Sequence, residues 1–284
     1  MILKDFIPAE DLRGYVQLYR IIHLQFNKGA APPFKAYPPR PEHCIAFYPY
    51  DTETVEFADG QPTKSKLPVV LYGQFSAVTK RHIGTNFLVV QIIFLPGAFY
   101  RLTGIPANCI TNQYTDARLL LGNQLNLVNE QLFYAKDYKA MIEIVNTFVR
   151  SLLRNIQQPP HPIENAFKMM LYGNRQYTLQ SIASQACLGL RQFERKCKIY
   201  TGVNPKLYAR IIRFDNAFRL KNTQPKMDWL SVAVQTDCHD YQHLVKEYKD
   251  FTGLSPQQFH QIENNAPERA FGLSEVFYNS KLNE

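Results

Sequence analysis

A short segment near the C-terminus occurs twice. Residues 200–205 are Tyr-Thr-Gly-Val-Asn-Pro, and residues 251–256 are Phe-Thr-Gly-Leu-Ser-Pro. Each copy ends a stretch in which apolar residues recur with the spacing i, i+4, i+7, which is typical of an amphipathic helix. This duplication predicts two similar small helical units in one chain.

A second helical pattern lies upstream of each copy, with a small residue, Ala183 or Ala233, where two helices must approach closely. Each unit is therefore predicted to be a helix-turn-helix. The upstream helices are offset by 50 residues and the downstream helices by 51, so the turn of the second unit should be one residue longer. Apolar spacing predicts a long helix from Pro205 to about Lys221 between the units, and proline is tolerated in its first turn.

Positive charge is concentrated in the first unit. The chain carries a net charge of +8; residues 175–226 contain 11 Lys or Arg and two acids, whereas residues 227–266 contain two basic and six acidic residues. Phosphate neutralisation supplies most of the sequence-independent affinity for nucleic acid. The first unit is therefore predicted to contribute more of that affinity. The alternative is a basic helical surface that is merely solvated.

The first 115 residues have the pattern of a β-rich domain, because short runs of Val, Ile, Phe and Tyr alternate with Pro, Gly and Asp turn signals. Several short strands favour a sandwich or a small, cupin-like barrel. Aromatic residues in this part are interpreted mainly as core, with a pocket lining as the alternative. The predicted strands cover residues 15–24, 44–48, 54–57, 69–75 and 87–94, and the aromatic residues are Phe47, Tyr48, Tyr50, Tyr72 and Phe75.

Helical spacing at residues 117–135 and 138–156 predicts helices that close this domain. Three prolines between residues 159 and 162 then block any helix and indicate a linker. The overall class is α+β, with an all-α part at the C-terminal end. The predicted division is a β-rich domain at 1–158, a linker at 159–163, a helical domain at 164–266 and a C-terminal tail at 267–284.

Composition argues against a membrane or secreted protein. The sequence has no run of 18 apolar residues and no signal-peptide pattern at its start, which predicts a cytoplasmic protein without a membrane partner. Its five cysteines form no Cys-x-x-Cys pair, so we expect reduced thiols.

The sequence contains no recognisable catalytic pattern. His23, His43 and His82 lack the spacing that brings imidazoles together on a strand. His239 and His243 are four residues apart, which on a helix could hold a metal, but surface histidines are the favoured interpretation. Phosphate loops, nucleophile elbows and His-Glu-x-x-His are absent from the sequence. We therefore predict no metal, no cofactor and no enzymatic activity.

Residues 177–261 resemble the DNA-binding domain of the AraC/XylS family of bacterial transcription regulators. The chain departs from the usual family pattern at Asp237-Cys238, where Gly-Phe is common, at Cys197, where Phe is common, and at His260, where Arg is common. The N-terminal half resembles, more weakly, the β-rich sensor-like domains that accompany such units, around residues 41–45 and 94–98. The features that carry the main resemblance are Ala183, Ala233, Arg195, Tyr208, Arg213, Ala217, Leu220, Asp240, Tyr-Thr-Gly-x-x-Pro at 200–205 and Phe-Thr-Gly-Leu-Ser-Pro-x-x-Phe at 251–259.

This resemblance implies a sequence-specific regulator, expected to be an activator, that contacts two adjacent major-groove segments through the second helix of each unit. A ligand or partner would act at the N-terminal sensor or dimerisation domain. Duplex DNA is the implied partner; RNA polymerase, a small-molecule effector and a second copy of the chain are further candidates, with residues 138–156 as the best dimer surface. The alternative is a non-catalytic binding module whose helical repeat serves protein contacts.

Helical faces and the resemblance together give the candidate DNA-contacting residues. Arginine can bind guanine bidentately, glutamate accepts from cytosine, glutamine suits adenine and valine suits the thymine methyl. Glu194 could equally pair with Lys198, and Arg213 could tie the joining helix to a unit instead of binding a phosphate. The complete set is Arg191, Gln192, Glu194, Arg195 and Lys198 in the first unit, Arg210 and Arg213 on the joining helix, and Tyr241, Gln242, Val245 and Lys246 in the second unit.

Overall fold

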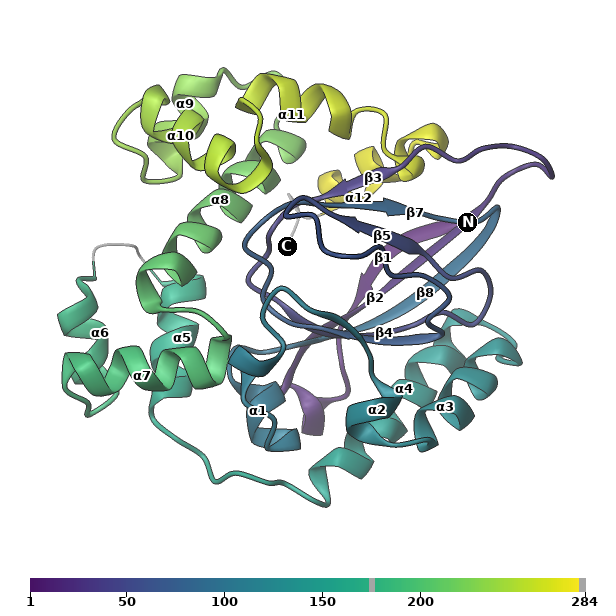
Figure 1. The fold of residues 1–284 in the computed structure, drawn as a ribbon, viewed down its shortest axis with the longest axis horizontal. Coiled ribbons are helices and arrows are strands. Elements are labelled where there is room, and N and C mark those ends of the chain that lie inside the picture. Colours follow the sequence, from purple (N-terminus) through teal and green to yellow (C-terminus); the bar gives the residue numbers. More distant parts are fainter. Residues whose placement is uncertain (174–176, 281–284) are drawn as a thin grey trace.

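In the computed structural model, which describes residues 1–173 and 177–280, a β-rich half is followed by a helical half (Figure 1). A larger antiparallel sheet has the strand order β1-β2-β8-β4-β6-β9, and a smaller one has the order β3-β7-β5. The strands are β1 (Ile2–Phe6), β2 (Val16–Gln25), β3 (Lys35–Tyr37), β4 (His43–Phe47), β5 (Thr54–Phe57), β6 (Val69–Tyr72), β7 (Thr79–His82), β8 (Asn86–Phe94) and β9 (Tyr114–Asp116).

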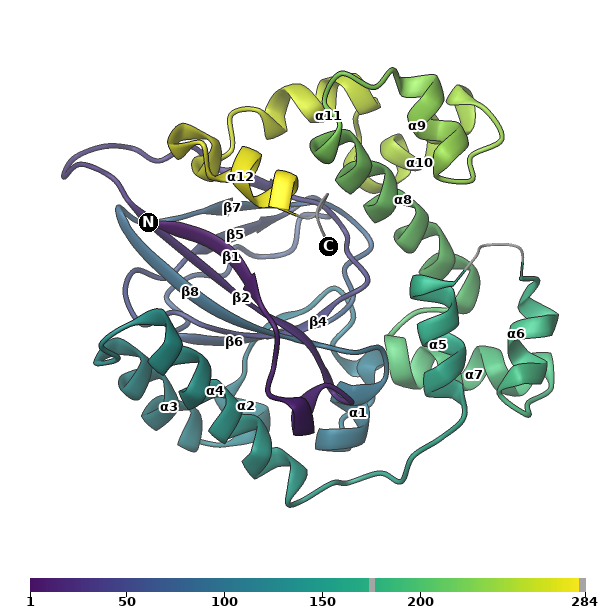
Figure 2. The same ribbon diagram turned by 180° about the vertical axis from the view of Figure 1, so that it is seen from behind.

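Helices cover one face of the larger sheet, and the smaller sheet lies over the other (Figures 1 and 2). Successive side chains of a strand point to opposite faces. Ile45 and Phe47 of β4 therefore join the core under the helices, where the Phe47 ring lies 5.8 Å from that of Phe148. Cys44 and Ala46 join the core between the sheets. The covering helices are α1 (Ala98–Thr103), α2 (Arg118–Leu121), α3 (Gln124–Phe133) and α4 (Tyr138–Leu153).

The α+β class and the five predicted strands are confirmed. Four further strands, β1, β3, β7 and β9, were not predicted because each has only three to five residues, and β7, Thr-Lys-Arg-His, is also polar. The predicted helix at 117–135 is divided into α2 and α3, since Gly122 adopts a positive φ of 92° between them. Four of the five aromatic residues interpreted as core are buried, and Tyr50 is half-buried.

The helical half contains the two predicted units. The first unit is α6 (Leu179–Gln185) with α7 (Leu190–Thr201), and the second unit is α9 (Trp229–Gln235) with α10 (Tyr241–Thr252). Residues 186–189 form the first turn and residues 236–240 the second, so the prediction of one extra residue is confirmed. The remaining elements are α5 (Ile163–Tyr172), the joining helix α8 (Pro205–Thr223), α11 (Pro256–Glu263), the 3-10 helix η3 (Pro267–Phe271) and α12 (Leu273–Ser280).

The segment expected to be a tail thus contains two ordered elements within the described residues. After α11 the chain turns back, and α12 lies against the β-rich half rather than extending into solvent (Figure 1). Ser274, Phe277 and Tyr278 of α12 are buried there.

The repeated Thr-Gly has a local structural cause. The hydroxyl of Thr201 donates to the carbonyl of Cys197 at 2.8 Å, and that of Thr252 donates to the carbonyl of Tyr248 at 2.7 Å. The following glycine ends the helix in the left-handed conformation, with φ of 87° at Gly202 and 76° at Gly253. Glycine adopts this conformation without the steric cost that a Cβ brings.

The rest of the repeat begins the next helix. Asn204 caps α8 by accepting from the backbone N–H of Leu207 at 2.9 Å, and Ser255 caps α11 by accepting from that of Gln258 at 3.4 Å. A proline follows each cap, at the position where a missing N–H costs least. The whole six-residue repeat is therefore one helix exit joined to one helix entry.

Both copies of the repeat also contact the β-rich half. The hydroxyl of Thr111 donates to the carbonyl of Gly202 at 2.9 Å, and the backbone N–H of Val78 donates to the carbonyl of Phe251 at 2.9 Å. Beside the first contact, the rings of Tyr100 and Tyr200 lie 4.9 Å apart. Each unit therefore docks through the C-terminal end of its second helix and leaves the other end of that helix facing away.

We predict that Gly202→Ala destabilises the protein more than Gly253→Ala does. Both substitutions place a Cβ in the left-handed region, at a cost of about 1 kcal/mol each. A Cβ at Gly202 would also lie 2.5 Å from Thr111 Oγ1, whereas none of the described atoms lies within 4 Å of one at Gly253. That clash adds about 1 to 3 kcal/mol.

Urea unfolding of both variants and of the Gly202→Ala, Thr111→Ala double variant measures the difference. The double variant should recover part of the loss, because the clashing hydroxyl is gone. Equal losses at the two glycines would contradict the docked arrangement of the first unit.

Candidate nucleic-acid interface

The outward face of α7 is exposed and basic. Phe193, Cys197 and Tyr200 are buried against α5, α6 and α8, as their spacing predicts. The opposite face therefore points away from the protein, and Arg191, Gln192, Arg195 and Lys198 on it are exposed while Glu194 is half-buried. Gln192 also has a structural role, because its side chain accepts a hydrogen bond from the N–H of Gly189 at 3.4 Å.

A shallow open hollow lies beside this face. It has a volume of about 490 Å³ and is lined by four cations and one carboxylate. Such a surface suits an anion, since the cations face water on one side and are not neutralised by an equal number of acids. The lining residues are Arg191, Glu194, Arg195, Lys198, Asn204 and Lys206.

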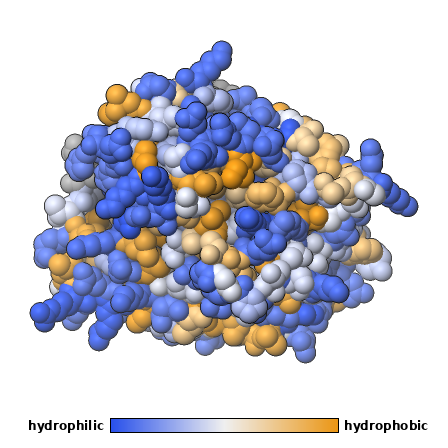
Figure 3. Space-filling model, turned by 45° about the horizontal axis from the view of Figure 1, so that its top comes forward, coloured by the Kyte–Doolittle hydropathy of each residue, from blue (hydrophilic) through white to orange (hydrophobic). Residues whose placement is uncertain are grey.

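The matching face of α10 is more mixed. Gln242 and Lys246 are exposed, whereas Tyr241 and Val245 are half-buried. Asp240 caps the helix by accepting from the N–H of His243 at 2.7 Å. Hydrophilic side chains cover much of the side of the molecule that carries α9 to α12, with apolar surface between them (Figure 3).

Arg210 and Arg213 form ion pairs within the protein. Arg210 binds Glu247 at 2.9 Å and also binds Asp250, and Arg213 binds the second oxygen of Glu247 at 3.0 Å. Glu247 lies on α10 and is buried. The two arginines therefore tie the joining helix to α10, which is the second of the two roles considered for Arg213 in the sequence. Their charge is largely neutralised within the protein.

The turn of each unit contains a non-glycine residue with a positive φ, at equivalent positions. Cys187 has φ of 55° and Asp237 has φ of 57°. Asp237 lies at the position where the AraC/XylS family, which this part of the chain resembles, usually has glycine. Glycine is preferred there because it adopts a positive φ without steric cost. The neighbouring Cys238 is buried in the place of the usual phenylalanine.

Of the histidines considered as metal ligands, the pair on the second unit comes together but forms no larger group of metal-ligating side chains within the described residues. His239 and His243 stack with ring centroids 5.6 Å apart on the exposed side of the second unit. In residues 1–173 and 177–280, no group of three His, Cys, Asp or Glu side chains is arranged to hold a metal ion. The same residues include no helix with the length and apolar character needed to cross a membrane.

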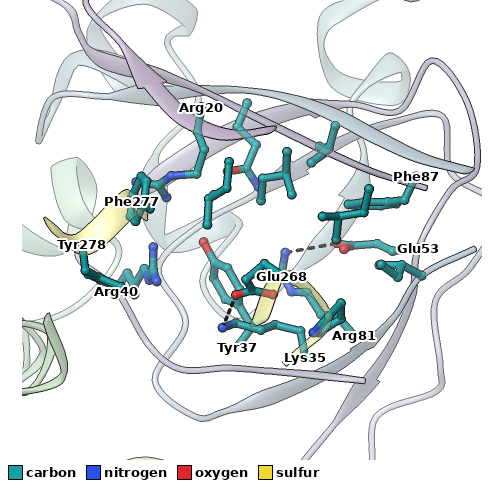
Figure 4. A pocket seen from close by; sticks show the side chains of 17 residues that line it. Arg20, Lys35, Tyr37, Arg40, Glu53, Arg81, Phe87, Glu268, Phe277 and Tyr278 are labelled. Atoms are coloured by element: carbon teal, nitrogen blue, oxygen red, sulfur yellow. Dashed lines mark hydrogen bonds and ion pairs between the residues drawn. The ribbon is translucent and has the colours of Figure 1, made fainter. Parts of the chain in front are cut away.

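The β-rich half contains a second candidate site, a pocket between the two sheets (Figure 4). One wall is formed by β2 and β8, including Arg20, Ile22 and Val89, and the facing wall by β3 and β7, including Tyr37 and Arg81. Arg20 and Gln91 are direct partners in the β2–β8 register. Residues of η3 and α12 close the open side.

Three arginines line this pocket; Arg20 and Arg81 are buried, and Arg40 is partly exposed. Arg20 binds Asp5 through two hydrogen bonds of 2.8 and 3.2 Å, and Arg81 binds Glu53 at 3.1 Å. Arg81 also stacks over the Tyr37 ring, 3.8 Å from its centroid. Each arginine retains one buried nitrogen without a hydrogen bond in the described structure, namely Nη1 of Arg20, Nε of Arg40 and Nη2 of Arg81. The first two of these lie 3.8 Å from carboxylate oxygens of Glu42 and Asp215.

This pocket was not predicted from the sequence. None of the aromatic residues considered as a pocket lining, residues 47, 48, 50, 72 and 75, is among its walls. Arg20 lies on β2, Arg81 on β7 and Arg40 in the segment after β3. Strands β3 and β7 were not predicted. The one available signal was Arg20, a charged residue in the middle of a strand and on the same strand face as Ile22 and Leu24.

Family models match two parts of the chain. Residues 182–262 match a helix-turn-helix domain of the AraC type, and residues 4–116 match a domain of unknown function. No curated protein matches the chain.

Among solved structures, the chain is similar to ToxT of Vibrio cholerae. One apo ToxT structure, of a point variant, is 10% identical with a TM-score of 0.48, and the match covers 86% of this chain and 97% of ToxT. Another, of wild-type ToxT with a bound unsaturated fatty acid, is 11% identical with a TM-score of 0.47 and coverage of 85% and 94%. The AraC-like transcriptional activator CuxR is 8% identical with a TM-score of 0.22 and coverage of 96% and 91%.

Proposed function

We propose that this chain, whose residues 182–262 match a helix-turn-helix domain of the AraC type, binds duplex DNA through α7 and α10 in two adjacent major-groove segments. The observation that carries this proposal is the exposed basic face of α7 above an open hollow with four cations. A protein-contact role is less consistent with this face, because lysine and glutamate, which stand beside the arginines here, are depleted in protein interfaces.

The two units contribute unequally in this proposal. Arg191 and Arg195 are exposed near the start of α7, where the second helix of a helix-turn-helix meets base edges. The first unit therefore supplies most of the anchoring charge. On the joining helix, Arg210 is already paired with Glu247 and Asp250 of the second unit, so Gln242, Val245 and Lys246 of α10 would mainly discriminate between bases.

We further propose that the β-rich half senses a small-molecule effector in the pocket between its sheets. The proposed division is a sensor domain at 1–158, a linker at 159–163 and a DNA-binding domain at 164–266. The linker lies between the end of α4 at Leu153 and the start of α5 at Ile163. Buried arginines in an otherwise largely apolar pocket support a binding role for it.

Arg191→Ala combined with Arg195→Ala is expected to weaken specific DNA binding at least about 30-fold, because each lost bidentate base contact costs about 1 to 3 kcal/mol. The DNA is a fragment selected by this protein from the genomic DNA of its source organism, and affinity is measured by fluorescence anisotropy. The matched control is Lys136→Ala with Lys139→Ala, which removes two exposed cations from the β-rich half. Unchanged affinity in the arginine variant would refute the proposed interface.

Salt dependence separates the two units. Lys198→Gln should reduce the slope of log affinity against log salt concentration by about 0.9, the value for one lost phosphate contact. Arg210→Gln should change the slope much less, since the guanidinium is paired with carboxylates in the protein. Lys246→Gln should fall between them. A larger change for Arg210→Gln than for Lys198→Gln would contradict the unequal contributions.

A further inference from the structure

The pocket between the two sheets, which we call the sensor pocket, is closed by the chain's own C-terminal segment. Phe277 and Tyr278 of α12, with Pro267 and Glu268 of η3, line its open side. In Figure 4, Phe277 lies beside Arg20 and Tyr278 beside Arg40. The guanidinium of Arg20 is 5.7 Å from the centroid of the Phe277 ring. We call residues 267–280 the plug.

The plug leaves little room in the pocket. The cavity that remains has a volume of about 70 Å³. Pockets that hold small organic ligands are typically ~300 to 1,000 Å³. A ligand of ordinary size therefore fits only where Phe277 and Tyr278 now lie.

The walls around this volume combine two chemistries. Ile22, Leu24, Phe87 and Val89 supply an apolar surface. Arg20, Arg40 and Arg81 supply three buried nitrogens without a hydrogen bond in the described structure. Nη1 of Arg20 and Nε of Arg40 each lie 3.8 Å from a carboxylate oxygen, of Glu42 and Asp215 respectively, which is beyond hydrogen-bond distance. A buried donor without a partner costs about 1 to 3 kcal/mol. An anionic group on an apolar body would satisfy these donors and bury its own apolar part.

The plug is held to the helical half as well as to the sensor domain. Lys35 of β3 binds Glu268 of η3 at 2.6 Å and Glu263 of α11 at 2.5 Å. Arg269 of η3 also donates to Asn222 of the joining helix. Displacement of the plug would therefore act directly on the contacts between the sensor domain and the second unit.

We propose that the plug is a displaceable internal occupant of the sensor pocket, and that an organic anion with an apolar body replaces it. The anion binds Arg20, Arg40 and Arg81, and its apolar part takes the place of Phe277 and Tyr278. This inference rests on the proposed sensing role of the β-rich half and names its ligand class and its means of control.

The test uses two dyes that share an aromatic body. 8-Anilinonaphthalene-1-sulfonate carries an anionic group, whereas N-phenyl-1-naphthylamine is neutral. Binding of both is followed by fluorescence with the full chain and without DNA. The result is therefore independent of the DNA interface, which the Arg191 and Arg195 variant tests separately.

Phe277→Ala combined with Tyr278→Ala is expected to bind the anionic dye at least about tenfold more tightly than the unsubstituted chain, because the competing side chains are removed. Glu268→Gln weakens the ion pair between Lys35 and the plug and leaves the apolar lining of the pocket unchanged. It should increase this affinity roughly threefold. The matched control is Val276→Ala, since Val276 lies on the exposed face of α12. Unchanged anion affinity in either plug variant overturns the proposal.

Gln91→Glu tests the anion site itself. Gln91 is the cross-strand partner of Arg20, so a carboxylate there can pair with the remaining nitrogen of Arg20. In the Phe277→Ala, Tyr278→Ala background, this substitution should lower the affinity for the anionic dye about tenfold, because a hydrogen bond to a charged group is lost. The neutral dye should bind as before. Equal weakening of both dyes overturns the anion assignment.

Discussion

A half-buried lysine between two carboxylates joins the two halves of this protein. Lys35 on strand β3 binds Glu263 of α11 and Glu268 of η3, and the Glu263 carboxylate is fully buried. Burial raises the pKa of Glu263, with Lys35 opposing that shift; for Glu268 burial also favours the neutral form, but Lys35 keeps its pKa below the usual value. Removal of one partner from such a cluster leaves buried charge uncompensated, so the position of the second unit depends on it.

Further contacts between the halves are the ion pair of Arg219 on α8 with Glu42, at 3.3 Å, and the two copies of the duplicated turn. The same Thr-Gly exit docks twice, once on Thr111 and once on Val78. Because docking uses the C-terminal end of α7 and of α10, the starts of these helices remain outside. The two units are alike in backbone but not in charge, since the exposed cations gather at α7 while the arginines of α8 bind Glu247 on α10.

Local chemistry could be predicted from the sequence, and long-range pairing could not. The repeat at residues 200 and 251, the longer second turn and the central strands all depend on the spacing of nearby residues. The partner of Arg210, by contrast, lies 37 residues away on another helix. The sensor pocket required strands β3 and β7, which are too short and polar to show a strand pattern, and a C-terminal helix that had been expected to be a tail.

The plug physically connects the sensor pocket to the DNA-binding half in this proposal. Hydrogen exchange of backbone amides in the full chain, with and without saturating 8-anilinonaphthalene-1-sulfonate, tests this connection directly. Faster exchange is expected in residues 267–280 when the dye is bound, because α12 leaves the pocket, with unchanged exchange in the buried strand β4. Full protection of α12 in the dye-bound protein would show that the plug is not displaced.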